Sequence, residues 1–149
     1  MIEKTIEAWH RFIRGEFPGG LDELLADDCT FYSPIVFTPQ KGKEVTKLYL
    51  NAAASTFNEG SGASGAGAPG ASGAAKKNSK FRYSKEVLSE NHAILEFETE
   101  IGGKYVNGVD IITCNDEGKI VEFKVMIRPL QAVNLMHEQM AAMLKKMQG

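Results

Sequence analysis

One acidic residue, Asp110, lies within an apolar run and is the first candidate for chemistry. Its neighbours Val109, Ile111 and Ile112 favour a β-strand. A carboxylate is costly to bury, so Asp110 either faces water or has a function. In an apolar cavity, desolvation should raise its pKa above that of a free aspartate. The sequence leaves two interpretations open: a pocket acid, or a carboxylate satisfied by hydrogen bonds from the backbone or from the indole of Trp9.

Aromatic and small residues supply the other candidates for a ligand site. Trp9, the single tryptophan, is expected either to pack in the core or to line a pocket. Gly108 shares a strand face with Asp110 and should leave room above the strand for a ligand. The residues predicted to bind a ligand are Trp9, Tyr32, Ser33, Tyr49, Gly108, Asp110 and Phe123. Of these, Asp110 is also the predicted catalytic residue.

The histidines and the glycines form no pattern typical of a metal or phosphate site. His10, His92 and His137 are scattered, with no HxxxH or HxH spacing, so no metal site is predicted. The glycine-rich run in the middle of the chain lacks both a preceding strand and the GK[ST] ending of a phosphate loop. We therefore predict no cofactor.

Composition and charge limit the classes of partner. The chain has 149 residues, of which 43% are hydrophobic, enough for one domain with a core. Its 17 Lys and Arg are interspersed with 19 Asp and Glu, which argues against a nucleic-acid partner. The chain has neither a secretory leader nor an apolar run long enough for a membrane span, so we expect a cytoplasmic protein with no membrane partner. Cys29 and Cys114 are expected to be buried free thiols, although sequence alone leaves a disulfide open.

Hydrophobic periodicity predicts the elements that must position these residues. Helical spacing of apolar residues predicts helices over residues 2–15, 21–25, 43–57 and 130–147. Strands are predicted over residues 29–32, 81–88, 92–101, 105–114 and 120–128, with a brief extended piece at 35–38. Turns are predicted at Gly102-Gly103 and at Asn115-Asp116-Glu117-Gly118. Helices segregated from a strand meander indicate an α+β protein with its helices on one face of a curved sheet.

One segment differs from the rest in composition. All sixteen residues from 60 to 75 are Gly, Ala, Ser or Pro. Such a stretch buries too little surface to offset its ordering entropy. We predict a single domain over residues 1–149 with a flexible insertion at about 58–80, whether natural or an engineered spacer. Because loop length costs little, its deletion should leave the fold intact.

The order of elements, with ADDCTFYSP near the start and GVDIITCNDEGKIVEF near the end, resembles the nuclear transport factor 2-like superfamily. Within it, the chain is similar to the SnoaL-like and ketosteroid-isomerase-like branch. The resemblance implies a cone, in which a strongly bent antiparallel sheet wraps around three N-terminal helices and a C-terminal helix is added. It also implies a pocket at the open end and, commonly, a dimer that pairs sheet against sheet.

The resemblance assigns expected roles to particular residues. Asp110 falls where the isomerases keep a protonated acid that donates to the substrate oxygen. Their general-base position falls at Ser33, and their oxyanion tyrosine position falls at Trp9, so both residue types differ from the family pattern. The arginine and second aspartate of the superfamily's epoxide hydrolases fall at Gly108 and Val125. Neither catalytic set is complete in this sequence.

Two functions follow as expectations. The first is a SnoaL-like protein that binds a small, mostly apolar, carbonyl-bearing molecule, with isomerase- or cyclase-type proton transfer if it is an enzyme. The second is a non-catalytic dimeric module with a vestigial pocket. Tyr105, Val109 and Ile111 lie on the strand face opposite Asp110 and are apolar. Because one set of helices cannot cover both faces, we expect a homodimer formed through the sheet.

Overall fold

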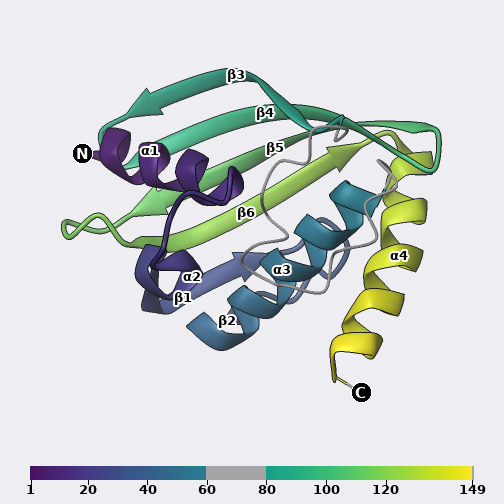
Figure 1. Ribbon diagram of the computed structural model, residues 1–149, viewed down its shortest axis with the longest axis horizontal. Helices are drawn as coiled ribbons and strands as arrows, with labels where there is room; N and C mark the ends of the chain where they lie inside the picture. The colour runs from purple at the N-terminus through teal and green to yellow at the C-terminus, as the bar shows by residue number, and fades with distance from the viewer. Residues whose placement is uncertain (60–79, 149) are drawn as a thin grey trace.

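The computed structural model describes residues 1–59 and 80–148, so the glycine-rich stretch 60–75 lies outside the described residues. The described residues form four helices and one six-stranded sheet (Figure 1). The helices are α1 (Ile2–Ile13), α2 (Gly20–Leu24), α3 (Lys43–Glu59) and α4 (Leu130–Gln148). The strands are β1 (Leu25–Tyr32), β2 (Gln40–Lys41), β3 (Arg82–Ser89), β4 (His92–Ile101), β5 (Lys104–Cys114) and β6 (Ile120–Arg128). Their order across the sheet is β2-β1-β6-β5-β4-β3.

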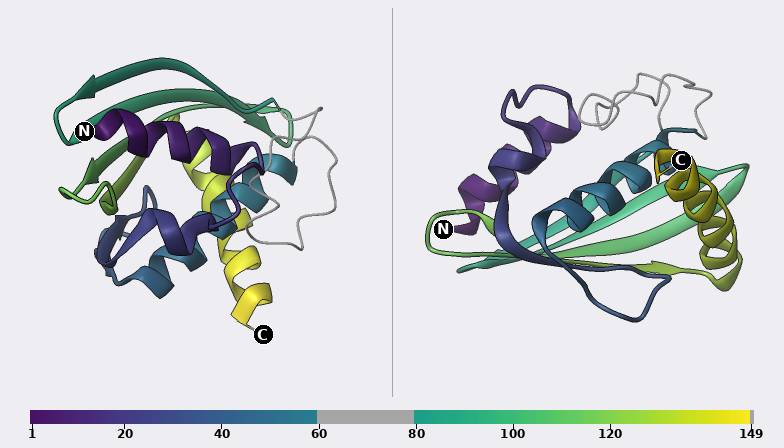
Figure 2. Two further views of the ribbon diagram at one scale, coloured as in Figure 1. Left: turned by 60° about the vertical axis from the view of Figure 1, so that its left-hand side comes forward. Right: turned by 90° about the horizontal axis from the view of Figure 1, so that it is seen from below.

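The sheet is curved, and the helices lie on its concave side (Figure 2). Helix α1 packs against β3, β4 and β5, whereas α3 packs against β1 and α4. Burial along β4 alternates strictly from Ala93 to Ile101, so one face of the sheet enters the core and the other faces outward. The predicted α+β cone, with three N-terminal helices and one C-terminal helix, is confirmed.

The prediction of a wholly antiparallel sheet is wrong at one pair of strands. Strands β1 and β6 run parallel, with Phe31 opposite Phe123. The other adjacent pairs are antiparallel. Alternation within one strand predicts which face it buries but not which distant strand becomes its neighbour, and the partner decides the direction.

The predicted extended piece at 35–38 also differs from the structure. The second strand is β2 at Gln40–Lys41, which pairs with β1. The chain bends after β1 because the hydroxyl oxygen of Ser33 accepts hydrogen bonds from the N–H groups of Ile35 (2.9 Å) and Val36 (3.2 Å). A serine hydroxyl that caps nearby N–H groups favours a turn over a strand.

The two predicted hairpin turns are confirmed. Gly102 and Gly103 join β4 to β5 with φ of 56° and 80°, the positive values that a tight hairpin requires at both central positions. Between β5 and β6, the side-chain oxygen of Asn115 accepts hydrogen bonds from the N–H groups of Glu117 (2.9 Å) and Lys119 (3.0 Å). These turns fix the register of β5, which carries Asp110, against its neighbours β4 and β6.

The core lies between the helices and the concave face of the sheet. Both cysteines are buried and free, as expected. The largest fully buried side chains come from helices and strands alike: Phe31, Phe97, Phe123, Ile2, Ile6, Leu25, Leu95, Ile101, Ile112, Ile120, Met136 and Val106.

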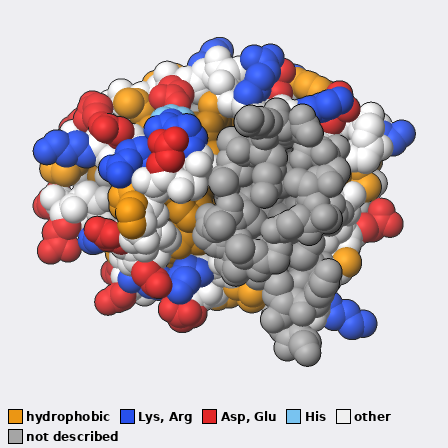
Figure 3. Space-filling model, viewed as in Figure 1, with side chains coloured by type: hydrophobic (Ala, Val, Ile, Leu, Met, Phe, Trp, Pro, Cys, Tyr) orange, Lys and Arg blue, Asp and Glu red, His pale blue; other side chains and the backbone are white. Residues whose placement is uncertain are grey.

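Charged side chains of both signs are spread over the face shown in Figure 3, with hydrophobic side chains between them. Among the helices within residues 1–59 and 80–148, none is both long and apolar enough to cross a membrane.

Candidate functional site

Asp110 lies on the concave face of the sheet, in the middle of β5. It stands opposite Leu95 on β4 and Val125 on β6, and only 6% of its surface is exposed. Among the described residues, its side chain makes one hydrogen bond: the hydroxyl of Tyr83 donates to Oδ2 at 2.6 Å. Asp110 is therefore a buried carboxyl group in apolar surroundings with a single donor.

A second donor extends this contact toward α1. The indole N–H of Trp9 donates to the hydroxyl oxygen of Tyr83 at 2.9 Å. The three side chains therefore form a chain, from Trp9 through Tyr83 to Asp110, that joins α1, β3 and β5. A direct hydrogen bond from Trp9 to Asp110 was one of the alternatives that the sequence left open, and the structure instead places Tyr83 between the two side chains.

Burial changes the proton affinity of both titratable members of this chain. Desolvation raises the pKa of Asp110 from 3.8 to about 7, and the hydrogen bond from Tyr83 opposes that rise. Desolvation, followed by the nearby charge of Asp110, raises the pKa of Tyr83 well above its usual value. Near neutral pH, Asp110 is thus poised between its acid and carboxylate forms, while Tyr83 keeps its proton.

Sequence reasoning missed Tyr83. Its residue type gave one signal, because a tyrosine hydroxyl needs a partner wherever it is buried. Its partner could not be found by counting along the chain, since 27 residues separate Tyr83 from Asp110 and β4 lies between their strands.

Three of the predicted ligand residues are joined by aromatic contacts on the concave side. The ring of Trp9 lies 5.0 Å from that of Phe123. Phe31 links this pair to α3, with its ring 6.2 Å from Phe123 and 5.3 Å from Tyr49. Trp9, Phe123 and Tyr49 thus belong to one aromatic wall, and Trp9 connects that wall to the hydrogen-bond chain.

Gly108 lies on the same face as Asp110, but the space above it is not free. A Cβ atom at this position would lie 2.6 Å from the ring of Phe97, 2.6 Å from the backbone oxygen of Met126 and 2.8 Å from the side chain of Ile127. The room that the sequence predicted for a ligand is therefore taken by Phe97. In this structure, Gly108 lets the ring of Phe97 lie against β5.

Comparison with known proteins identifies the fold. No family model matches the sequence, and no curated protein matches it. A solved structure of a steroid delta-isomerase from Pseudomonas aeruginosa is similar at 27% identity and a TM-score of 0.77, over 97% of this chain and 92% of that chain. A cystatin-like uncharacterized protein from Silicibacter pomeroyi is similar at 25% identity and a TM-score of 0.72, over 93% of this chain and 83% of that chain.

A third likeness, to an NTF2-like protein of unknown function from Burkholderia xenovorans, shows the fold alone. Identity is 17% and the TM-score is 0.54, over 85% of this chain and 81% of that chain. The chain has the nuclear transport factor 2-like fold. Within this NTF2-like fold, Asp110 lies on the inner face of the bent sheet.

The two remaining predicted residues lie apart from the Asp110 chain. Tyr32 pairs with Lys124 across β1 and β6, and the Lys124 ammonium lies 4.6 Å from the centre of its ring. Because Tyr32 follows the buried Phe31, it points to the outer face of the sheet. Ser33 uses its hydroxyl oxygen to cap the turn after β1.

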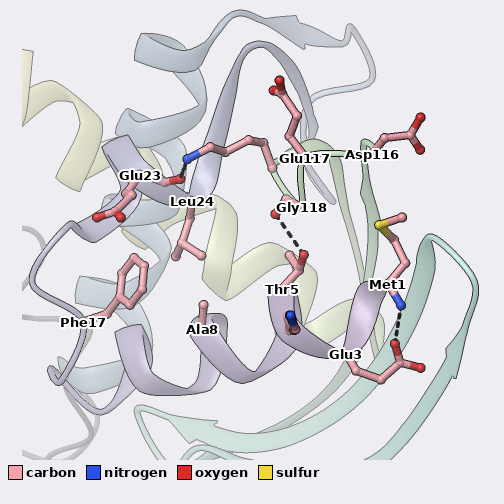
Figure 4. Close-up of a pocket in the computed structure, with 12 residues that line it drawn as sticks. Met1, Glu3, Thr5, Ala8, Phe17, Glu23, Leu24, Asp116, Glu117 and Gly118 are labelled. Carbon is pink, nitrogen blue, oxygen red and sulfur yellow. Dashed lines mark hydrogen bonds and ion pairs between the residues drawn. The ribbon is translucent and has the colours of Figure 1, made fainter.

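A depression of about 660 Å³ lies elsewhere on this NTF2-like protein, between α1, α2 and the β5–β6 turn (Figure 4). Ala8, Phe17 and Leu24 give it an apolar side, and charged residues surround the rest. Asp110 is not among its lining residues. Within residues 1–59 and 80–148, no group of three His, Cys, Asp or Glu is placed to hold a metal ion.

Proposed function

We propose that this NTF2-like protein is a SnoaL-like or ketosteroid-isomerase-like protein that binds a small, mostly apolar, carbonyl-bearing molecule at Asp110. The observation that carries the proposal is a carboxyl group buried in apolar surroundings whose pKa is raised to about 7. In its protonated form, such a group can donate a hydrogen bond to a carbonyl oxygen. The aromatic wall beside it suits an apolar ligand body.

The structural likeness supports the choice of a first ligand to test. The steroid delta-isomerase is similar over nearly the whole of both chains. A ketosteroid has the rigid apolar body and the carbonyl oxygen that the Asp110 region would accept, and we propose it as the first probe.

The geometry supports binding more strongly than turnover. Proton transfer next to a carbonyl needs a base to remove the proton and a donor to stabilise the charge on oxygen. Asp110 fits the donor role. Ser33, at the position of the isomerases' base, already accepts two backbone hydrogen bonds through its oxygen. If the protein is an enzyme, we propose isomerase- or cyclase-type proton transfer with Asp110 as its catalytic residue.

Trp9 fluorescence provides the binding test, because its indole is part of the hydrogen-bond chain. A ketosteroid should change this fluorescence and protect it from an external quencher. Asp110→Ala should weaken binding by about tenfold or more, the typical effect of losing a hydrogen bond to an ionisable group. Asp110→Asn retains a donor and should bind nearly as well as the wild type.

Glu98→Ala, on the outer face, is the control and should leave affinity unchanged. Failure of the wild type to bind, or equal affinity in Asp110→Ala, would contradict the binding proposal. Turnover is tested separately with a β,γ-unsaturated ketosteroid. Isomerisation would create a conjugated enone, which is detected by its ultraviolet absorbance.

The outer face of the sheet favours a second candidate function, a non-catalytic homodimeric module. Ile94 lies between Val87 and Ile111 in register, and Val109 lies opposite Met126. Val87, Ile94 and Met126 are 51%, 43% and 51% exposed. Adjacent apolar side chains left open to solvent are typical of a protein–protein contact.

Light scattering at tens of micromolar protein tests this candidate. We expect a dimer mass for the wild type and a monomer mass for Ile94→Glu. Leu130→Glu, which adds the same charge at an exposed position at the start of α4, is the control and should remain dimeric. A monomeric wild type would rule the dimer out. A dimer that binds no ketosteroid would favour the module over the ligand-binding protein.

A further inference from the structure

The hydroxyl group of Thr99, in β4, is buried without a partner. Thr99 is 3% exposed, and within residues 1–59 and 80–148 its Oγ1 atom has no hydrogen-bond partner. Thr5 is buried to the same extent, but its hydroxyl donates to the backbone oxygen of Gly118 at 2.9 Å. An unpaired buried hydroxyl costs free energy, so the Thr99 hydroxyl calls for an explanation that Thr5 does not. A ligand oxygen would supply the missing partner.

Thr99 lies on the same face of the sheet as Asp110. Burial alternates along β4, so Leu95 and Thr99 both face the concave side. Leu95 stands opposite Asp110 on β5, and Thr99 stands opposite Val106. Val106 precedes Asp110 by four residues, which places the two polar groups about 13 Å apart along the strands, at about 3.3 Å per residue.

An apolar surface separates the two polar groups. Phe97 lies between Leu95 and Thr99 on β4 and stands opposite Gly108. Its ring lies close against β5, because Gly108 has no side chain to hold it away. The same ring stacks on that of Phe81 at 5.1 Å. The concave face therefore carries a carboxyl group, an aromatic ring and a hydroxyl group in that order, which suits an apolar ligand body with an oxygen at each end.

We infer that Thr99 is a specificity-determining residue of the Asp110 site, and that it selects ligands with a second oxygen of the order of 10 Å from the carbonyl. The inference rests on the proposed ligand site and deepens it. A threonine hydroxyl both donates and accepts, so a ketone or a hydroxyl group on the ligand meets the requirement. A ligand with one oxygen would leave Thr99 unpaired, and such a mismatch is what lets a buried polar group discriminate between ligands.

Two steroids that differ by one oxygen test the inference, with Trp9 fluorescence as the measure of binding. Androst-4-ene-3,17-dione has an oxygen at each end of its rigid body, whereas androst-4-en-3-one lacks the second. The wild type should bind the dione about three- to tenfold more tightly, the usual effect of one neutral hydrogen bond. Thr99→Val, which keeps the shape but not the hydroxyl, should lose this preference. Thr99→Ser should retain it, as should the control Thr5→Val.

The outcomes separate this inference from the proposed function. Equal affinity of the wild type for the two steroids, or an undiminished preference in Thr99→Val, would overturn the role of Thr99 while leaving the ligand site at Asp110 in place. Binding of neither steroid would contradict the ligand site itself and, with it, the role of Thr99.

Urea unfolding of the ligand-free protein gives a second test that needs no steroid. Thr99→Val should unfold at a higher urea concentration than the wild type, because it removes an unpaired buried hydroxyl. Thr5→Val should unfold at a lower concentration, because the backbone oxygen of Gly118 loses its donor. A lower unfolding midpoint in Thr99→Val would show that its hydroxyl is paired within the protein, and would overturn the inference.

Discussion

Two buried polar residues of β5, Asp110 and Asn107, lie on opposite faces of the sheet and differ in the number of their hydrogen-bond partners. The amide nitrogen of Asn107 donates to Glu96 Oε2 and to the backbone oxygen of Phe97, both at 3.0 Å. Its oxygen accepts a hydrogen bond from Arg128 Nε at 2.8 Å. Asn107 is thus fully satisfied by protein groups, whereas Asp110 has one donor among the described residues.

The comparison shows that the extent of burial alone does not identify a functional residue. Asn107 and Asp110 are 7% and 6% exposed, so the extent of burial does not distinguish them. The number of hydrogen-bond partners distinguishes the two residues. A satisfied amide stabilises the pairing of strands, whereas a carboxyl group with a free oxygen and a raised pKa retains the capacity to bind or transfer a proton.

The largest expected effect is the dependence of stability on pH that arises from Asp110. The folded protein binds this proton more tightly than the unfolded chain, because burial raises the pKa from 3.8 to about 7. The contribution to folding is fully present below about pH 3.8 and is lost as the pH rises toward 7. The difference corresponds to about 4 kcal/mol in the free energy of unfolding.

Urea unfolding of the wild type and of Asp110→Asn over this pH range measures that contribution. The stability of Asp110→Asn relative to the wild type should increase as the pH rises. A constant difference between the two proteins would show that Asp110 titrates in the folded protein as it does in the unfolded chain.

A substitution at Gly108, which lies between Asn107 and Asp110 in β5, should have the next largest effect on the free energy of unfolding. In Gly108→Ala the added methyl group meets the Phe97 ring and the Met126 backbone oxygen at 2.6 Å. We expect a loss of about 1–3 kcal/mol in unfolding free energy, the usual cost of overpacking. Val109→Ala, at the next position on the outer face, should lose less. Unchanged stability of Gly108→Ala would show that Phe97 moves aside readily.

Removal of the Asn107 side chain tests how much its hydrogen bonds contribute to stability. Asn107→Ala should reduce the unfolding free energy by about 2 kcal/mol, because it takes partners from Glu96 and Arg128. Unlike the effect of Asp110, this loss should be nearly constant between about pH 5 and pH 8, since an amide does not titrate. A strong pH dependence would mean that the outer network is coupled to the inner carboxyl group.

The smallest effect on the free energy of unfolding is expected at an exposed ion pair on the outer face of the sheet. Arg82 and Glu98 are 3.0 Å apart, with side chains that are 66% and 30% exposed. Glu98→Gln should change the unfolding free energy by less than about 1 kcal/mol, and added salt should shrink the difference further. A larger change would place Glu98 within the polar network of Asn107.

Much of the fold was predictable because it depends on local chemistry. The alternation along β4, the double glycine at Gly102 and Gly103, and the side-chain capping by Asn115 each act over a few residues. Helices were predictable for the same reason, although boundaries shifted: the strand predicted over 29–32 begins at Leu25. The parallel pairing of β1 with β6 was not predictable, because it depends on how distant segments meet.

The sequence by itself determined that an acid lies in an apolar strand, with an aromatic set available to surround it. Only the tertiary structure decided that Tyr83 and Trp9 reach Asp110 in one hydrogen-bond chain. It also decided that Phe97 fills the space above Gly108 and that Tyr32 faces outward. Residue type and periodicity specify which face a side chain takes. Its partners, and with them the protonation of a buried carboxyl group, depend on contacts between elements far apart in the chain.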